Sequence, residues 1–232
     1  MLTYYGIDWT YVILVLPAVF FALWAQYHVQ STFKKASSVP VSSGMTGAEA
    51  ARMILDRNGL YAVRIERVSG ELTDHFDPRS GVLRLSESVY GASTAAAVGV
   101  ACHEAGHAVQ HEENYRPIRI RSAVIPLTRI GSTLAIPLLL IGLLLNFSAL
   151  AYIGILLFAF SAVFQLLTLP VEFDASARAL KEMADCGRFS EEELTFSRKV
   201  LRAAALTYVA ALAVSLMQIL RLLLITDRRG RR

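Results

Sequence analysis

Two histidines and a glutamate lie close together in the stretch VACHEAGHAVQ at residues 100–110. Residues four apart share one face of a helix, so His103 and His107 can direct ring nitrogens at one point, where zinc needs ligands at about 2.0–2.1 Å. Glu104 is one residue round, which keeps its carboxylate out of direct coordination but within reach of a water on the metal. The spacing predicts zinc-dependent hydrolysis of peptide bonds, with Glu104 as the general base that moves the proton.

The flanking residues favour a helix at this position. Apart from the motif, residues 98–110 carry no formal charge and include no proline, and Gly106 leaves room beside the metal. The competing interpretation is a buried helix whose two histidines are hydrogen-bonded to neighbours. Cys102 adjoins His103 but lies about 100° around the helix from it, so we expect it to be a small buried residue rather than a ligand. With Cys186 as the second cysteine and no CxxC, neither a disulfide framework nor a thiolate zinc site is expected.

A catalytic zinc usually has three protein ligands and keeps the fourth position for water, so a further ligand is needed. His111 continues the four-residue series, but helical drift carries it too far round for the same ion, and we expect it near solvent or behind a ligand. Glu172 follows an apolar segment in LPVEFDASARA, where we expect a new helix to begin on the same side of the membrane as the motif. The residues alone leave three alternatives to Glu172 open: Asp174, His75 and Asp74.

The elements that hold these residues belong to a membrane protein. Hydrophobic residues make up 54% of the 232 residues, which is high for a soluble domain. Four apolar segments are candidate spans, at 11–27, 131–145, 147–170 and 203–225. The second is long enough only if 123–130 joins it, and Arg129 in that extension can send its guanidinium to the headgroups. Residues 11–27 are expected to be an uncleaved anchor, because no basic residue precedes them.

Charge gives the expected orientation. The net charge of +4 is too mild to indicate nucleic-acid binding. Basic residues concentrate after the first span, before the second, and between the third and fourth, so the positive-inside rule places these loops in the cytoplasm. Both termini would then be outside, which the tail DRRGRR at 227–232 contradicts. We keep the loops cytoplasmic because they hold more basic residues near more span ends.

The region between the first two spans has the pattern of a small α+β domain. Thr46 and Glu49 form a capping box for a helix that ends at Asn-Gly, YAVRIERV alternates like a strand, and LTDHFDPRSGVLRLS predicts a hairpin. Ser93 or Thr94 can cap the motif helix. VLRLS is a candidate edge on which an extended substrate could add a strand. His75 or Arg178 is a candidate for stabilising the oxyanion.

The predicted fold class is an α-helical integral membrane protein of about four spans with a small α+β, zincin-like cytoplasmic domain that carries the HExxH helix. Five segments follow: an N-terminal membrane anchor at 1–27, the zincin-like catalytic domain at 28–122, a transmembrane hairpin at 123–170, a helix supplying the third zinc ligand at 171–202, and a C-terminal transmembrane helix with a basic tail at 203–232.

Taken together, HEAGH, the downstream EFDASARA, the LTDHFDPRSG hairpin and this layout of spans resemble the YugP-like membrane zinc metallopeptidases. The sequence is more distantly similar to HtpX-type and CAAX-processing membrane proteases. The resemblance implies that His103, His107 and Glu172 bind zinc and that Glu104 is the catalytic base. The sequence departs from the HtpX-type pattern at Ser176, where that pattern has an aspartate that would support a ligand histidine. Whether Asp174, His75 or no residue takes this role is open at this point.

The expected function is that of a membrane-bound zinc metalloendopeptidase. It would be a multi-pass protein of the plasma membrane with its site on the cytoplasmic side, and it would cleave membrane or membrane-proximal proteins. The expected partners are protein or peptide substrates and the lipid membrane, with no nucleic acid. Two alternatives remain: an intramembrane site-2-type protease whose HExxH helix itself spans, and a non-catalytic scaffold whose zinc is closed by a fourth ligand, His111 or Asp174.

Overall fold

The computed structural model describes residues 8–230, and these form two compact units. The HExxH unit comprises residues 27–119 and 170–206, and the helical unit comprises residues 8–26, 120–169 and 207–230. Residues 28–119, most of the predicted segment 28–122, and the predicted segment 171–202 belong to the same unit. The first seven residues of the predicted anchor and the last two arginines of the basic tail lie outside the described residues.

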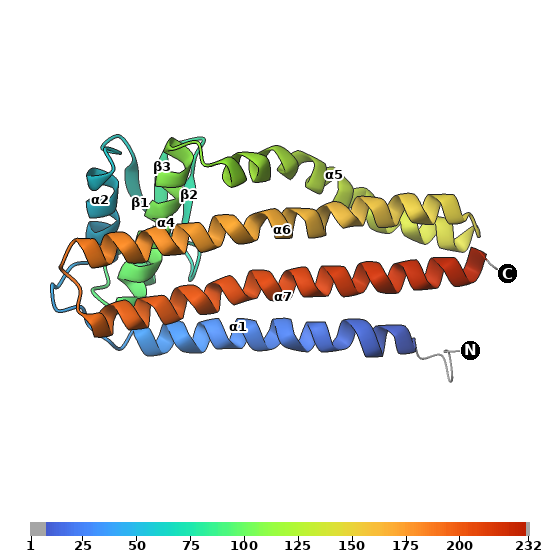
Figure 1. The fold of residues 1–232 in the computed structure, drawn as a ribbon, viewed down its shortest axis with the longest axis horizontal. Helices are drawn as coiled ribbons and strands as arrows, with labels where there is room; N and C mark the ends of the chain where they lie inside the picture. Colours follow the sequence, from blue (N-terminus) through green and yellow to red (C-terminus); the bar gives the residue numbers. More distant parts are fainter. Residues whose placement is uncertain (1–7, 231–232) are drawn as a thin grey trace. The chain divides into compact units, whose positions relative to one another are not determined.

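Helices dominate both units (Figure 1). A short π-helical turn, η1, precedes the first long helix. The described helices are η1 (Tyr11–Val15), α1 (Leu16–Ala36), α2 (Gly47–Arg57), α3 (Glu87–Tyr90), α4 (Ala95–Glu112), α5 (Arg116–Leu144), α6 (Ser148–Asp185) and α7 (Glu191–Gly230).

Four of these helical stretches are long and apolar enough to cross a membrane, and each overlaps one of the four predicted spans over all or nearly all of its length. They are Tyr11–Ala36, Arg116–Leu144, Ser148–Asp185 and Glu191–Asp227. In the helical unit many large apolar side chains are exposed rather than packed, among them Ile136 and Leu140 of α5 and Ile153 and Leu156 of α6. Exposed apolar surface of this extent is what a lipid-facing helix presents. The predicted fold class is therefore confirmed for its four spans.

One predicted break in the chain is wrong. We expected a new helix to begin after the third span, but α6 continues without interruption through Pro170 and carries Glu172. A proline inside a helix removes one backbone hydrogen bond, and in spanning helices neighbouring groups make this tolerable. The helix ends at Asp185, two residues before Gly187, whose φ of 64° is a left-handed conformation that glycine adopts without strain.

An ion pair inside the helical unit accounts for a charged residue in the last apolar helix. Arg221 of α7 donates from Nε to Oδ2 of Asp8 at 2.9 Å, and its Nη2 pairs with the same oxygen. The guanidinium also lies over the ring of Tyr11, 5.2 Å from its centroid. A charge in an apolar segment is stabilised by a partner of this kind.

In the HExxH unit, the helix α2 is capped as the sequence predicted. The Thr46 hydroxyl accepts a hydrogen bond from the Glu49 backbone N–H, and the Glu49 carboxylate accepts one from the Thr46 N–H at 2.8 Å. The buried face of α2, with Ala50, Ile54 and Leu55, packs on α4. The predicted capping box is therefore confirmed, and it fixes the start of the helix that supports the motif helix.

The three strands form one sheet in the order β1 (Arg64–Val68), β3 (Val82–Ser86), β2 (His75–Asp77). β2 and β3 are the predicted hairpin and pair antiparallel, whereas β1 and β3 pair in parallel. The expectation that β3 offers a free edge is wrong, because it is the central strand and both of its edges are paired. Its side chains are buried on both faces, Leu83 and Leu85 on one and Val82 and Ser86 on the other, which agrees with a central position.

One large apolar core holds α2, the sheet, α4 and the parts of α6 and α7 in this unit together. The core is rich in small side chains on α4, which allows other elements to approach that helix closely. Its fully buried members include Ile54, Leu55, Leu83, Leu85, Val98, Ala101, Cys102, Ala105, Ala179 and Met183. Cys102 is one of them, as expected from the sequence, and burial raises the pKa of its thiol.

Candidate metal centre

The motif stretch forms the middle of α4, an 18-residue helix that starts at a side-chain cap. The Thr94 hydroxyl accepts a hydrogen bond from the Ala97 backbone N–H, which confirms Thr94 rather than Ser93 as the cap. His103 and His107 follow one turn apart with ring centroids 4.7 Å from each other. The helix therefore presents both imidazoles on one side, as the four-residue spacing predicted.

Glu172 of α6 completes a cluster with the two histidines. Its Oε2 lies 3.3 Å from Nε2 of His103 and 3.6 Å from Nε2 of His107. One donor atom from each residue can be chosen so that all lie within 4.8 Å of one another. The Glu172 side chain is 6% exposed and the histidine side chains are 14% and 13% exposed, so the cluster is mostly shielded but remains open on one side.

These three donors fit a zinc ion. Ligands at about 2.0–2.2 Å from a tetrahedral ion lie about 3.3–3.6 Å from each other, which matches the two histidine–glutamate distances. Two imidazoles and one carboxylate are also a ligand set that catalytic zinc sites use. Within the described residues the cluster has three such donors. The arrangement thus leaves a coordination position for water or substrate.

Gly106 lets α6 approach the motif helix. A Cβ built at this position would lie 2.8 Å from the carbonyl oxygen of Ala175, closer than side-chain carbons come to a backbone oxygen. The sequence suggested that Gly106 leaves room for the metal, but the room is used by the backbone of α6. Ala175 is one turn after Glu172, so this contact sets how near the carboxylate comes to the histidines.

Gln110 orients His107 through Nδ1, the ring nitrogen that does not face Glu172. Its Nε2 donates to the carbonyl oxygen of Val171 at 2.8 Å and to Oδ2 of Asp174 at 2.7 Å, which uses both amide hydrogens. The amide oxygen, 3.0 Å from Nδ1 of His107, must therefore accept a hydrogen bond from that nitrogen. When His107 is neutral, its lone pair is then on Nε2, the nitrogen that faces Glu172.

Ser176 contacts the same ring nitrogen, Nδ1, of His103. Its hydroxyl lies 3.1 Å from Nδ1 of His103, one turn of α6 beyond Glu172. The position where the sequence departs from the HtpX-type pattern thus still contacts His103, with a hydroxyl in place of a carboxylate. Asp174 does not contact His103; it accepts a hydrogen bond from Gln110, which contacts His107. His75 does not support either histidine, because its Nδ1 faces the carbonyl oxygen of Thr73.

The other candidates have different partners. Asp74 accepts hydrogen bonds from the backbone N–H and hydroxyl of Ser86 and so ties the loop before β2 to the end of β3. His75 is exposed, with Nδ1 2.8 Å from the carbonyl oxygen of Thr73. His111 is exposed and packs edge-on against the ring of Phe76. None of the three belongs to the donor cluster found among the described residues.

Arg178 is occupied by two carboxylates. Its Nε donates to Asp174 and its Nη1 to Glu113, each at 2.6 Å, and the guanidinium lies 5.7 Å from the centroid of the Tyr115 ring. These bonds tie α6 to the end of the motif helix. The structure therefore places Arg178 in a link between two helices rather than beside the donor cluster.

Glu104 is held beside the cluster by the edge strand. The backbone N–H of Phe76 in β2 donates to its Oε2 at 3.1 Å. Burial raises the pKa of the Glu104 carboxyl, which the neighbouring imidazoles of His103 and His107 partly offset. Its carboxylate is thus a stronger proton acceptor than an exposed one.

The electrostatics of the cluster favour a cation. Burial lowers the pKa of His107, but its hydrogen bond to Glu172 and the negative charges of Glu104 and Glu172 outweigh this effect and raise the pKa to about 9. The same two carboxylates that hold a proton on the imidazole also attract a divalent ion.

Sequence reasoning missed Gln110 and the backbone of Phe76. A polar residue three positions after His107, in a run of small apolar side chains, is a signal that could have indicated Gln110. The Phe76 contact had no signal of its own, because it is made by a backbone N–H whose position depends on how the hairpin packs on α4.

The chain was compared with known proteins. The family model described as "Putative neutral zinc metallopeptidase" matches residues 11–227. The protein named "Putative membrane protease YugP" of Bacillus subtilis (strain 168) is 48% identical over 215 residues, which cover 93% of this chain and 96% of that protein. No solved structure matches.

Proposed function

We propose that this chain, which belongs to the family of neutral zinc metallopeptidases, is a membrane-bound endopeptidase that uses one zinc ion at His103, His107 and Glu172. The observation that carries the proposal is the convergence of these three donors from two helices, with Glu104 held next to them. Its substrates are membrane or membrane-proximal proteins, because the site is in a chain with four apolar helices long enough to span.

The chemistry divides between the ion and the protein. His103, His107 and Glu172 would hold the ion, which would supply a bound water with a pKa of about 7 and polarisation of the substrate carbonyl. Glu104 takes the proton of the attacking water and passes it to the leaving amine. Gln110 and Ser176 hold the two imidazoles with Nε2 toward the cluster, so that neither ring has to reorient during the reaction.

The outer edge of β2 is the proposed binding surface for the substrate backbone. Among the described strands β2 pairs only with β3, and its Phe76 N–H points to Glu104 rather than into the sheet. A peptide that adds to this edge as an extended strand would run past Glu104 and the donor cluster. This replaces β3, whose edges are both paired, as the strand that receives the substrate.

The test compares zinc content and casein cleavage of the purified, detergent-solubilised chain with those of single variants. Glu104→Gln should keep about one zinc and lose cleavage, whereas His103→Ala and Glu172→Ala should lose both. His111→Gln, a change of an exposed histidine on the same helix, is the matched control and should keep both. Cleavage by Glu104→Gln at the wild-type rate would refute the proposal.

The cytoplasmic position of the site is part of the proposal and needs its own test. It rests on the basic residues near the ends of the apolar segments. A cysteine at Glu112, an exposed position at the end of α4, should react with a membrane-impermeant reagent in inverted vesicles but not in intact cells. The opposite pattern would put the site outside. Gln110 is unsuitable for this labelling because it is fully buried.

The same labelling tests the first alternative, an intramembrane protease, and the number of protein ligands tests the second, a zinc scaffold. An intramembrane site-2-type protease would protect Glu112→Cys from the reagent on both sides, but α4 is not among the helices apolar and long enough to span. A non-catalytic zinc scaffold would need a fourth protein ligand. His111 is directed at Phe76, and Asp174 is bonded to Gln110 and Arg178, so these two candidates are otherwise engaged.

A further inference from the structure

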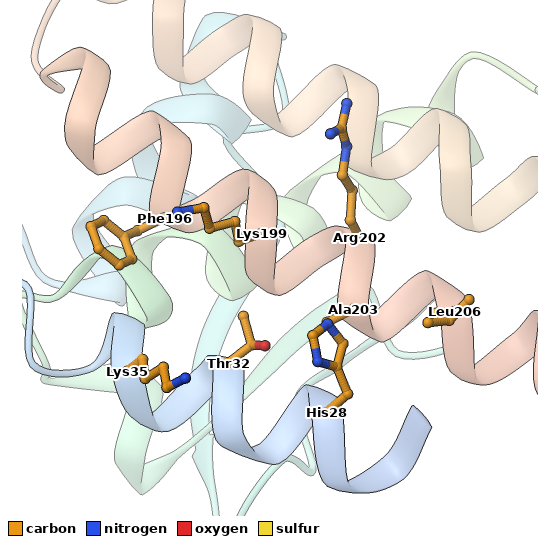
Figure 2. Close-up of a pocket in the computed structure, with 8 residues that line it drawn as sticks. All are labelled: His28, Thr32, Lys35, Phe196, Lys199, Arg202, Ala203 and Leu206. Carbon is orange, nitrogen blue, oxygen red and sulfur yellow. The ribbon is translucent and has the colours of Figure 1, made fainter. Parts of the chain in front are cut away.

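A cavity of about 480 Å³ lies between α1 and α7 within the HExxH unit (Figure 2), and none of the three cluster residues lines it. One face of α1 contributes His28, Thr32 and Lys35, and one face of α7 contributes Phe196, Lys199 and Leu206. The spacings of three and four residues along each helix place these side chains on a single stripe. Its volume is that of a pocket for a small molecule or a headgroup.

The lining is cationic and rich in hydrogen-bond donors. Lys35 and Lys199 bring ammonium groups, Arg202 a guanidinium and Thr32 a hydroxyl, and none of the lining residues is acidic. In the part of the chain that the structure describes, neither lysine has an ion pair with a carboxylate. The Lys199 ammonium lies over the ring of Phe196, 4.9 Å from its centroid, which holds it at the cavity wall. A concave surface with uncompensated positive charge attracts an anion.

Both helices become apolar at the cavity. On α7, residues 203–220 carry no charged side chain, and Leu206 at the start of this run lines the cavity. On α1, the run before Gln26 is apolar, and Trp24 and Tyr27 at its end are 52% and 70% exposed. Tryptophan and tyrosine at such positions mark the boundary between hydrocarbon and headgroups. The cavity therefore combines a cationic part with the start of an apolar surface.

We propose that this cavity binds the phosphate group of an anionic phospholipid. Lys35, Lys199 and Thr32 hold the phosphate oxygens, and an acyl chain follows α7 along Leu206. A free phosphate would use the same cations but has no group for the apolar wall. Basic pockets beside spanning helices bind anionic headgroups by this combination of charge and apolar contact. The proposal depends on α1 and α7 being spans and not on proteolysis.

The experiment measures binding to the purified full-length chain in neutral detergent by calorimetry. Three probes are titrated: dioctanoyl phosphatidylglycerol, dioctanoyl phosphatidylcholine and inorganic phosphate. The test variant is Lys35→Gln/Lys199→Gln. The matched control, Lys34→Gln/Arg198→Gln, removes the same charge from the adjacent positions of the same two helices, which do not line the cavity. Lys35→Arg/Lys199→Arg keeps the charges and shows whether the positions still fold and bind.

We expect phosphatidylglycerol to bind at one saturable site per chain. The glutamine test variant should weaken this binding about tenfold or more, because each cation near a membrane surface contributes a factor of about five to the affinity. The control and the arginine variant should stay within about twofold of wild type. Equal losses in the test and control variants would mean diffuse attraction and would overturn the proposal. Phosphatidylcholine or inorganic phosphate binding as tightly as phosphatidylglycerol would overturn it too.

Discussion

The amide oxygen of Gln110 lies 3.0 Å from Nδ1 of His107, three residues earlier on the same helix, while its amide nitrogen bonds two groups of α6. One buried side chain thus fixes the ring of a proposed ligand and ties the two helices of the metal centre together.

Replacing Gln110 with methionine keeps the volume but removes all three hydrogen bonds. We expect zinc affinity and cleavage to fall about 10–100-fold, the usual effect of losing a group that orients a ligand histidine. Zinc competition with a chelator and casein cleavage measure these losses. Glu112→Gln, an exposed change on the same helix, should leave both unchanged. Wild-type zinc affinity in Gln110→Met would show that the His107 ring does not need the hydrogen bond from Nδ1 to Gln110.

Replacing Gly106 with alanine should separate α4 from α6. The new Cβ would lie 2.8 Å from the Ala175 carbonyl oxygen, and a backbone atom cannot rotate away. Overpacking of this kind costs about 1–3 kcal/mol in the free energy of unfolding, and we expect a parallel loss of bound zinc. Gly91→Ala is the control, because its Cβ would meet only a side-chain nitrogen of Arg67 at 3.6 Å. Full zinc content in Gly106→Ala would contradict the importance of this contact.

Metal removal should destabilise the fold. An ion that binds only the folded state stabilises it by about 4 kcal/mol at a free concentration 1,000 times its dissociation constant. Adding zinc to chelator-treated protein should therefore raise the midpoint of thermal unfolding, followed by circular dichroism. In Glu172→Gln the added zinc should have little effect, whereas His111→Gln should respond like wild type. A zinc response that survives in Glu172→Gln would place the ion elsewhere.

The hairpin beside Glu104 should become less stable in acid. Hydrogen bonds from Ser80, the Arg79 backbone and Arg84 lower the pKa of Asp77 below its usual range. A carboxyl whose pKa is lowered by folding stabilises the folded state above its unfolded pKa of about 3.9, and this stabilisation disappears as the pH falls below that value. The protection factors of the β2 and β3 amides, which are corrected for the intrinsic exchange rate at each pH, should therefore fall as the pH drops below about 3.9. Asp77→Asn should have lower protection factors in β2 and β3 at pH 6 than Glu71→Gln, an exposed control in the loop before β2, and these factors should depend less on pH. Identical pH profiles in both variants would rule out Asp77 as the origin.

The ion pair between Asp8 and Arg221 should stabilise the helical unit. Exposed ion pairs contribute about 0–1 kcal/mol to the free energy of unfolding, and breaking a buried pair costs about 3–5 kcal/mol. Because this pair is partly buried, we expect Asp8→Asn to lower the free energy of unfolding by about 1–3 kcal/mol. Exchanging the charges in Asp8→Arg/Arg221→Asp should recover part of it. Thermal unfolding in detergent measures both, and an exchange variant less stable than either single change would argue against a direct pair.

The sequence predicts the local part of this metal centre well and the rest less completely. His103 and His107 share a face because helix geometry alone brings them together, and the capping box of α2 and the β2–β3 hairpin depend likewise on neighbouring residues. Glu172 lies 69 residues after His103, so spacing gives no measure of its distance, and only the family resemblance separated it from Asp174, His75 and Asp74.

The wrong expectations concern contacts between distant segments. β3 is central because β1 joins it in parallel across the intervening loop, and a strand pattern does not reveal which neighbour it will pair with. The expected start of a new helix after the third span is wrong because α6 continues through Pro170, where the surroundings of the helix override the usual effect of proline. Gln110 and Ser176 acquire their roles only once α6 lies against α4.

The HExxH unit is made of two stretches of chain that are separated by α5 and the apolar part of α6. During synthesis the motif helix therefore leaves the ribosome long before Glu172 does. The complete set of three donors cannot form until the α5–α6 pair has emerged. The order of translation thus delays assembly of the metal centre until the chain has made the segments that would place it in a bilayer.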